Sequence, residues 1–316
     1  MGIAGLGRMG LYHFQRLGLR DDCRVVAVYD RDADVRRSWK DTKAEFADVW
    51  SQFVRNPRIE VVLLATPPAT HAPLAIEVLA AGKHVIVETP LCLDVADAKE
   101  MIAASERAQR MLSVAHLRRW DDDFLAAKAA LENGQLGRPV SLKYVVWQYN
   151  PAKRTREGGS PDDWRLRHQT GGGTLWELGA HLFDQLLQLV PEKPRDVFAR
   201  LIPSRAHPEC DDGFLCVVTF ADSVTAHLEV NRAALAPLDT GWMITGTDGA
   251  YAHGTQYSRT DEGEIADVPT PHHATDWDQY YAAVVRRLRH AGPNPVPADE
   301  ARRVIELIAA AHDYGT

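Results

Sequence analysis

Cysteine is scarce in this sequence, and basic residues are not in excess. The four cysteines form no C-x-x-C pair; they are Cys23, Cys92, Cys210 and Cys216. A disulfide scaffold or a zinc knuckle is therefore not expected, and a reducing cytoplasm is the expected location. Lys and Arg total 36 against 43 Asp and Glu, which gives a formal net charge of −7. This acidic balance argues against nucleic acid and anionic lipid as partners.

Long apolar runs are also missing. No stretch of 18 apolar residues occurs, so no membrane span is expected. Residues 1–10 lack the basic start and the long apolar stretch of a secretory signal. The hydrophobic share of 45% and the charged share of 25% are those of an ordinary globular protein, and 316 residues are enough for two domains.

The first third of the chain alternates short apolar runs with helical patterns, which is typical of a parallel sheet built from βαβ units. Strands are expected at 1–4, 24–29, 61–65, 84–87 and 111–115, with helices at 9–19, 32–45, 73–81 and 95–107.

The pattern changes near residue 118. Helices are expected at 121–131, 174–189, 277–290 and 298–311, and half-buried strands at 140–147, 197–202, 214–220, 225–230 and 242–245. Residues 150–173 form a long Pro-, Gly- and charge-rich stretch, either disordered or a functional loop. We therefore predict an α/β protein. Residues 1–118 form a doubly wound Rossmann domain. Residues 119–316 form an α+β domain with a mostly antiparallel open sheet, whose C-terminal helix packs back on the first domain.

A glycine-rich motif provides the first functional signal. Residues 5–10 read G-L-G-R-M-G, which is G-x-G-x-x-G between a predicted strand and a predicted helix. In this context Gly5 allows a tight turn, Gly7 lets a pyrophosphate approach the backbone, and Gly10 lets the helix pack closely. Asp30 follows Gly10 by 20 residues, the spacing of a carboxylate that binds the adenosine ribose. The motif thus predicts NAD, with NADP as the alternative because Arg31 could accommodate a 2′-phosphate.

Further motifs follow in order along the chain. They are T-P-P-A-T-H at 66–71, G-K-H-V-I-V-E-T-P-L at 82–91, R-R-W-D at 118–121, W-R at 164–165, and G-G-G-T-L-W-E-L-G-A-H-L-F-D at 171–184. Together they resemble the glucose–fructose oxidoreductase/inositol dehydrogenase (Gfo/Idh/MocA) family, in particular its scyllo-inositol dehydrogenase-like branch. The resemblance is dense up to about residue 190 and weak beyond it.

The resemblance implies an oxidoreductase that transfers hydride between a nicotinamide and a secondary alcohol of a sugar, inositol or glycoside. It also implies a homodimer or homotetramer formed through the open face of the second sheet. The cofactor-binding residues expected from the motifs and the resemblance are Gly5, Gly7, Arg8, Met9, Gly10, Asp30, Arg31, Thr66, Pro67, His71, Glu88, Thr89 and Arg165. The expected substrate-binding residues are Arg118, Trp164, Glu177, His181 and Asp184.

Two departures from the family pattern concern the expected catalytic residues Thr89, Glu177 and His181. Many members carry Glu-Lys-Pro, whereas this chain has Thr89, which cannot shuttle a proton in the neutral range. Many members carry an Asp four residues before the His, whereas this chain has Glu177. Glu177, His181 and Asp184 are spaced at i, i+4 and i+7 of a predicted helix, so they are expected to share one helical face. His181 is the expected base, since an imidazole titrates near neutral pH.

Other interpretations remain for the same residues. His181 could be a core histidine, Glu177 a surface acid, Thr89 a neutral spacer and Arg165 a surface charge. Arg118 and Arg119 could form salt bridges between domains. The pair His272-His273 has no third ligand at a useful spacing, so no metal site is expected.

Three functions follow from these patterns. The first is an NAD(P)-dependent dehydrogenase. The second is an NAD-using enzyme that cleaves glycosides by transient oxidation and elimination, which the altered Glu-Lys-Pro motif favours. The third is a non-catalytic NAD-binding sensor, which the loss of the lysine favours.

Overall fold

A computed structural model describes residues 1–41, 43–149, 164–205, 207, 209–259, 264–270 and 274–315. The chain divides into two compact units. The first combines Met1–His116 with Asp278–Ile305, and the second combines Leu117–Trp277 with Glu306–Thr316. Residues 278–305 thus belong to the first unit, although the sequence analysis assigned them to the second domain.

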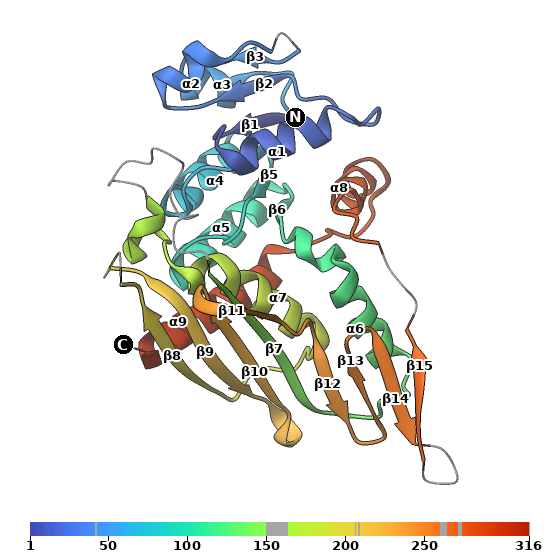
Figure 1. The fold of residues 1–316 in the computed structure, drawn as a ribbon. Helices are drawn as coiled ribbons and strands as arrows, with labels where there is room; N and C mark the ends of the chain where they lie inside the picture. The colour runs from blue at the N-terminus through green and yellow to red at the C-terminus, as the bar shows by residue number, and fades with distance from the viewer. Residues whose placement is uncertain are drawn as a thin grey trace. The chain divides into compact units, whose positions relative to one another are not determined.

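The first unit contains a fully parallel six-stranded sheet (Figure 1). Its order, β3-β2-β1-β4-β5-β6, is that of a Rossmann fold and confirms the predicted fold class. The strands are β1 Gly2–Ala4, β2 Ala27–Tyr29, β3 Glu45–Phe46, β4 Val61–Leu64, β5 His84–Val87 and β6 Leu112–Val114. The helices are α1 Arg8–Leu17, α2 Ala33–Ser38, α3 Trp50–Arg55, α4 His71–Ala80, α5 Val95–Ala108 and α8 Asp278–His290.

The predicted helix at 32–45 is wrong beyond residue 38. Asp32 caps α2 by accepting a hydrogen bond from the N–H of Asp34. The helix then ends at Trp39, whose backbone is extended and whose ring packs against Phe14 and Phe46 at 4.9 and 6.1 Å. Because this aromatic cluster holds Phe46 beside the sheet, residues 45–46 form an edge strand instead of continuing the helix.

The second unit contains a nine-stranded sheet in the order β15-β14-β13-β12-β7-β10-β9-β8, with β11 paired to β7. All its pairings are antiparallel except β7 with β10. The strands are β7 Pro139–Tyr149, β8 Asp196–Pro203, β9 Asp211–Thr219, β10 Thr225–Asn231, β11 Ala233–Asp239, β12 Met243–Gly246, β13 Gly249–Ala252, β14 Thr255–Arg259 and β15 Ile265–Pro269. The sequence analysis missed β11 and β13–β15, which alternate too weakly to stand out.

Helix α6 Asp122–Glu132 precedes this sheet, and α7 Ala180–Leu189 lies across it (Figure 1). The rings of Phe183 on α7 and Phe214 on β9 are 6.2 Å apart. The predicted helix at 174–189 is not a single α-helix, because Leu175–Gly179 forms a π-helical turn before α7 begins. The last helix, α9, spans Ala298–Gly315. In the described ranges, no helix has the length and apolar character that crossing a membrane requires.

Close packing at Gly10 gives the first prediction. A Cβ atom at Gly10 would stand 1.8 Å from the carbonyl oxygen of Gly5, whereas one at Gly7 would meet no atom within 4 Å. Gly10→Ala is therefore expected to lower the free energy of unfolding by about 3 kcal/mol, because backbone must move to admit the methyl group. Gly7→Ala is the matched control and should lose less than about 1 kcal/mol. Urea unfolding measures both, and equal losses would contradict the packing argument.

Candidate cofactor and active site

The glycine-rich loop after β1 has the geometry that a pyrophosphate requires. Gly5 has a φ of +87°, and a Cβ there would stand 2.5 Å from the carbonyl oxygen of Ala65. The space next to Gly7 is open, and α1 begins at the next residue. The first N–H groups of a helix have no acceptor within the helix, and they carry its positive dipole end. The loop therefore fits an anionic diphosphate at the start of α1.

Asp30 lies at the end of β2, directly beside this loop. Its Oδ2 accepts a hydrogen bond of 2.7 Å from the N–H of Leu6, and its Oδ1 accepts one of 2.9 Å from the N–H of Asp32. Each carboxylate oxygen can accept more than one hydrogen bond, so the fixed carboxylate retains capacity for ribose hydroxyls. Arg31, the next residue, is exposed.

The predicted contact of His71 with the cofactor is not supported by its surroundings. The side chain is fully buried, and its Nε2 and Nδ1 lie 2.9 Å from the carbonyl oxygens of Thr66 and Pro90, respectively. Burial lowers the pKa of His71. Because both ring nitrogens face backbone carbonyl oxygens, His71 joins the segment after β4 to the segment after β5. Thr66 and Pro67 remain half-buried at the end of β4.

A buried polar chain supports the Glu88-Thr89-Pro90 segment after β5. His13, on α1, donates from Nε2 to Oε1 of Glu88 at 2.5 Å, and its Nδ1 lies 2.7 Å from the hydroxyl oxygen of Tyr281. Oε2 of Glu88 accepts a hydrogen bond of 2.8 Å from the N–H of Thr89. The exposed fractions are 0% for His13, 8% for Glu88 and 1% for Tyr281. Glu88 is thus held inside the unit, and the half-buried Thr89 stands beside it.

In the second unit, the π-helical turn carries Glu177, and His181 follows on the first turn of α7. Asp211, at the start of β9, anchors this turn because its Oδ2 accepts hydrogen bonds of 2.9 Å from the N–H groups of Thr174 and Leu175. The side chain of Glu177 is 43% exposed, and its Oε2 lies 2.6 Å from Nη1 of Arg232. His181 is half-buried. π-helical turns are frequent at functional sites, and this one carries the predicted acid and is followed directly by the helix that carries the predicted base.

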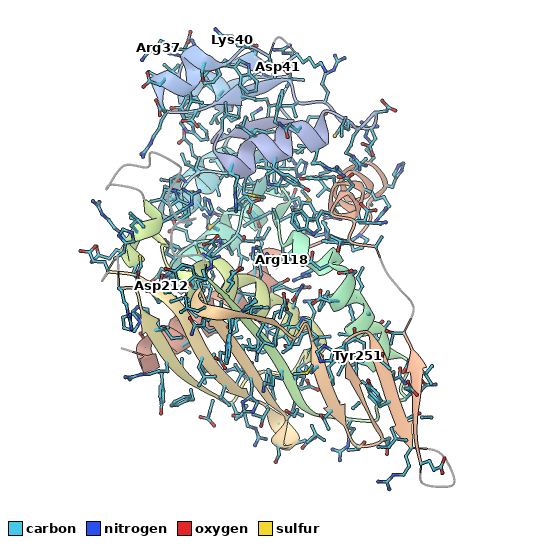
Figure 2. All side chains as sticks on the ribbon, viewed as in Figure 1. Arg37, Lys40, Asp41, Arg118, Asp212 and Tyr251 are labelled. Atoms are coloured by element: carbon cyan, nitrogen blue, oxygen red, sulfur yellow. The ribbon has the colours of Figure 1, made fainter. Side chains whose placement is uncertain are left out.

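The surroundings of Asp184 do not support the predicted role of a substrate ligand. It is 2% exposed, and its two oxygens accept hydrogen bonds of 2.8 and 2.6 Å from Nε and Nη2 of Arg119. This bidentate pair lies inside the second unit, so Asp184 holds Arg119 in place. Arg118, labelled in Figure 2, is 38% exposed, and its guanidinium lies 3.9 Å from the carboxylate of Asp121.

Arg165 stacks on its neighbour, with its guanidinium carbon 4.4 Å from the ring centre of Trp164. Residues 150–163 of the predicted loop and the pair His272-His273 lie outside the described residues. Among the residues that the structure describes, no group of three His, Cys, Asp or Glu side chains could hold a metal ion.

Three supporting residues were given no role from the sequence: His13, Asp211 and Arg232. Arg119 was considered only for a salt bridge between domains, not for the pair with Asp184. His13 could have been found, because Gly10, His13 and Leu17 form one buried helical stripe that contains a polar residue. The doublet Asp211-Asp212 before an apolar strand was a weaker signal. Nothing in the sequence indicated the partner of Arg232.

Comparison with known proteins identifies the family. A family model described as "Oxidoreductase family, NAD-binding Rossmann fold" matches residues 1–116, and one described as "GFO/IDH/MocA C-terminal domain" matches residues 124–252. The chain belongs to the Gfo/Idh/MocA family. It is therefore an NAD(P)-dependent oxidoreductase, as the motifs predicted.

The chain is similar to scyllo-inositol 2-dehydrogenase (NADP(+)) of Bacillus subtilis, at 27% identity over 98% of this chain and 92% of that protein. It is 30% identical to myo-inositol 2-dehydrogenase of Thermotoga maritima, over 79% of this chain and 73% of that protein. Among solved structures, an NAD-binding protein from Listeria innocua matches with a TM-score of 0.87 and 30% identity, covering 99% of this chain and 94% of that one.

The buried Glu88 gives a prediction for stability against pH. Burial alone would raise the pKa of Glu88, but the hydrogen bonds from His13 and Thr89 outweigh it and hold the pKa below its ordinary value. The ionised form therefore stabilises the fold above about pH 4.5, and this contribution is lost as pH falls through the lower folded pKa. Wild type should lose stability more steeply than Glu88→Gln as pH falls below about 4.5.

Urea unfolding at a series of pH values measures this difference. The matched control, Glu100→Gln, removes an exposed carboxylate on α5 of the same unit and should retain the wild-type slope. If Glu88→Gln also retains that slope, Glu88 is not the source of the pH dependence.

Proposed function

We propose that this protein is a dehydrogenase for the secondary alcohol of an inositol or a related sugar. The observation that carries this proposal is an accessible acid, Glu177, four residues before a half-buried imidazole, His181, in a chain whose first unit is an NAD-binding Rossmann fold. The names of two relatives, a scyllo-inositol and a myo-inositol dehydrogenase, support this substrate class.

The proposed chemistry needs a proton acceptor on the protein. NAD, when bound, accepts a hydride from the carbon that carries the hydroxyl group. His181 takes the proton of that hydroxyl, since an imidazole can accept a proton near neutral pH. Glu177 accepts hydrogen bonds from neighbouring hydroxyls of the substrate and orients the imidazole ring of His181. The same residues run the reverse reaction, in which His181 returns the proton.

Thr89 stands where many family members have a lysine, and this limits its role. A hydroxyl can donate to and accept from a substrate hydroxyl or a cofactor ribose, but it does not exchange protons in the neutral range. We therefore assign proton transfer to His181, and to Thr89 the binding of a substrate hydroxyl or a cofactor ribose.

We also propose a preference for NAD over NADP. The carboxylate of Asp30 is fixed beside the glycine-rich loop, where it would repel a 2′-phosphate and bind ribose hydroxyls. The diphosphate would be held by the glycine-rich loop and the start of α1, at Gly5, Gly7, Arg8, Met9 and Gly10. The further residues proposed to bind the cofactor are Thr66, Pro67, Glu88 and Arg165. Those proposed to bind the substrate include Arg118 and Trp164.

A homodimer or homotetramer in the cytoplasm completes the proposal. Apolar side chains are exposed on strands of the large sheet, as at Val140, Tyr149, Phe198 and Val268, which supports association through this sheet. The four free cysteines fit a reducing compartment.

Assays of the wild-type chain with NAD test the proposed reaction. We expect net NADH formation, followed by absorbance, with scyllo-inositol, myo-inositol or free sugars. Release of nitrophenol from a nitrophenyl glycoside without net NADH would favour glycoside cleavage instead. NAD binding with no turnover in either assay would favour a sensor.

His181→Ala tests the proposed base. Turnover is expected to fall at least about tenfold, because a general base contributes roughly 10²–10⁴ to the rate, while NAD affinity by calorimetry is unchanged. His227→Ala removes an exposed imidazole on β10 of the same unit and should leave turnover unchanged. Wild-type turnover in His181→Ala would remove this residue from the mechanism.

Asp30→Asn tests the cofactor preference. The amide oxygen can still accept from the N–H of Leu6, but the negative charge is gone. We expect the ratio of NADP to NAD affinity to rise about tenfold or more, which corresponds to about 1.4 kcal/mol. Asp32→Asn neutralises the exposed carboxylate that caps α2 and should leave the ratio unchanged. An unchanged ratio in Asp30→Asn would contradict the preference.

A further inference from the structure

Arg232 is a buried cation that forms an ion pair with the exposed acid of the proposed site, Glu177. It directly follows β10, it is 9% exposed, and its Nη1 lies 2.6 Å from Oε2 of Glu177. Its backbone is also fixed, because its N–H donates a hydrogen bond of 2.8 Å to the carbonyl oxygen of Asp212, the second residue of β9 (labelled in Figure 2). The guanidinium therefore approaches Glu177 from a rigid strand end.

The two partners of this ion pair differ strongly in exposure. The side chain of Arg232 is 10% exposed and that of Glu177 is 43% exposed. Within the described part of the chain, Nε of Arg232 is buried and has no hydrogen-bond partner. A buried guanidinium with an unsatisfied N–H group depends strongly on the one carboxylate that compensates its charge. The carboxylate is thus immobilised by a buried partner while much of its side chain stays open to solvent.

The anchors of the π-helical turn come from two neighbouring strands. Asp211 at the start of β9 binds the N–H groups at the beginning of the turn, and Arg232 after β10 binds Glu177 in its middle. β9 and β10 pair directly, with Gly213 opposite Asn231. The position of Glu177 is therefore set by the sheet at two points, which gives more precision than a helix surface alone provides.

We propose that Arg232 is a positioning residue for polyol binding: it holds the carboxylate of Glu177 in the orientation that accepts hydrogen bonds from substrate hydroxyls. This inference rests on the proposed function. A carboxylate that is already oriented loses little side-chain entropy when a polyol binds, so its hydrogen bonds contribute more fully to affinity.

The test measures KM and kcat separately for scyllo-inositol and myo-inositol, using the full chain with saturating NAD. Arg232→Gln is expected to raise KM about tenfold or more, because a carboxylate that is no longer oriented binds substrate hydroxyls less tightly. Arg232→Lys keeps the charge and should recover part of this loss. Arg200→Gln removes an exposed arginine from β8 and should retain the wild-type KM.

A merely structural role would give a different result. It would reduce the folded fraction, and hence kcat and thermal stability, with KM unchanged in both Arg232 variants, and this outcome would overturn the proposal. If Arg232→Gln does not fold, Arg232→Lys and Glu177→Gln still carry the test, because both retain a hydrogen-bonding partner for the other side chain. A wild-type KM in both of these variants would also overturn it.

Calorimetry separates this proposal from the proposed function. The inositols are titrated into wild type and Arg232→Gln saturated with NADH, so that binding is measured without turnover. Wild type that neither binds nor oxidises any inositol would overturn both proposals. Wild type that binds and oxidises an inositol, together with an Arg232→Gln variant of equal affinity, would overturn the role of Arg232 alone. Weaker binding to the variant supports it.

Discussion

A charge taken out of water must be compensated by a partner with good geometry, and this requirement shapes the interior of both units. In the first unit, the carboxylate of Glu88 is almost fully buried at the end of β5. Its two oxygens are engaged by His13 from α1 and by the N–H of the next residue, and Tyr281 from α8 contacts the far side of the imidazole. This chain of hydrogen bonds joins the segment after β5 to α1, the helix that begins at the glycine-rich loop.

The second unit contains two ion pairs that compensate a buried charge, and they differ in the solvent exposure of the acid. Arg119 and Asp184 form a closed bidentate pair with both side chains less than 10% exposed. Both partners are buried, and removing either one would leave an uncompensated charge inside. In the ion pair of Arg232 and Glu177, the side chain of the cation is buried and that of the acid is exposed to solvent. This asymmetry distinguishes the acid proposed to act in binding from the acid that serves the fold.

Local patterns were sufficient for much of the fold. Apolar runs such as 61–65 and 84–87 predicted buried parallel strands, since few other elements bury a short uninterrupted apolar run. The glycine spacing predicted the loop at 5–10 for equally local reasons. The helix at 32–45 was wrong because Trp39 and Phe46 pack together with Phe14, a contact that no window of sequence contains.

The candidate site was less predictable for the same reason. Glu88 and His13 are 75 residues apart, and Arg232 and Glu177 are 55 apart. Motifs identified Glu177 and His181 as candidates, but not the strand ends that hold them. The π-helical turn was also hidden, because its composition reads as an α-helix. Asp184 was taken for a ligand on the assumption of a continuous α-helical face, and Arg119, which pairs with it, is 65 residues away.

The structure also bears on the threonine that replaces the family's lysine. Glu88 already has a partner for each oxygen, so its buried charge does not depend on a cation at position 89. A threonine can occupy this position without leaving the acid uncompensated, whereas a lysine there would be free to titrate. Loss of the lysine therefore removes a titratable group and leaves the support of the segment intact. Under the proposed function, the proton that leaves the substrate hydroxyl is then received by an imidazole whose own helical segment is held by Asp211, with Glu177 beside it oriented by Arg232.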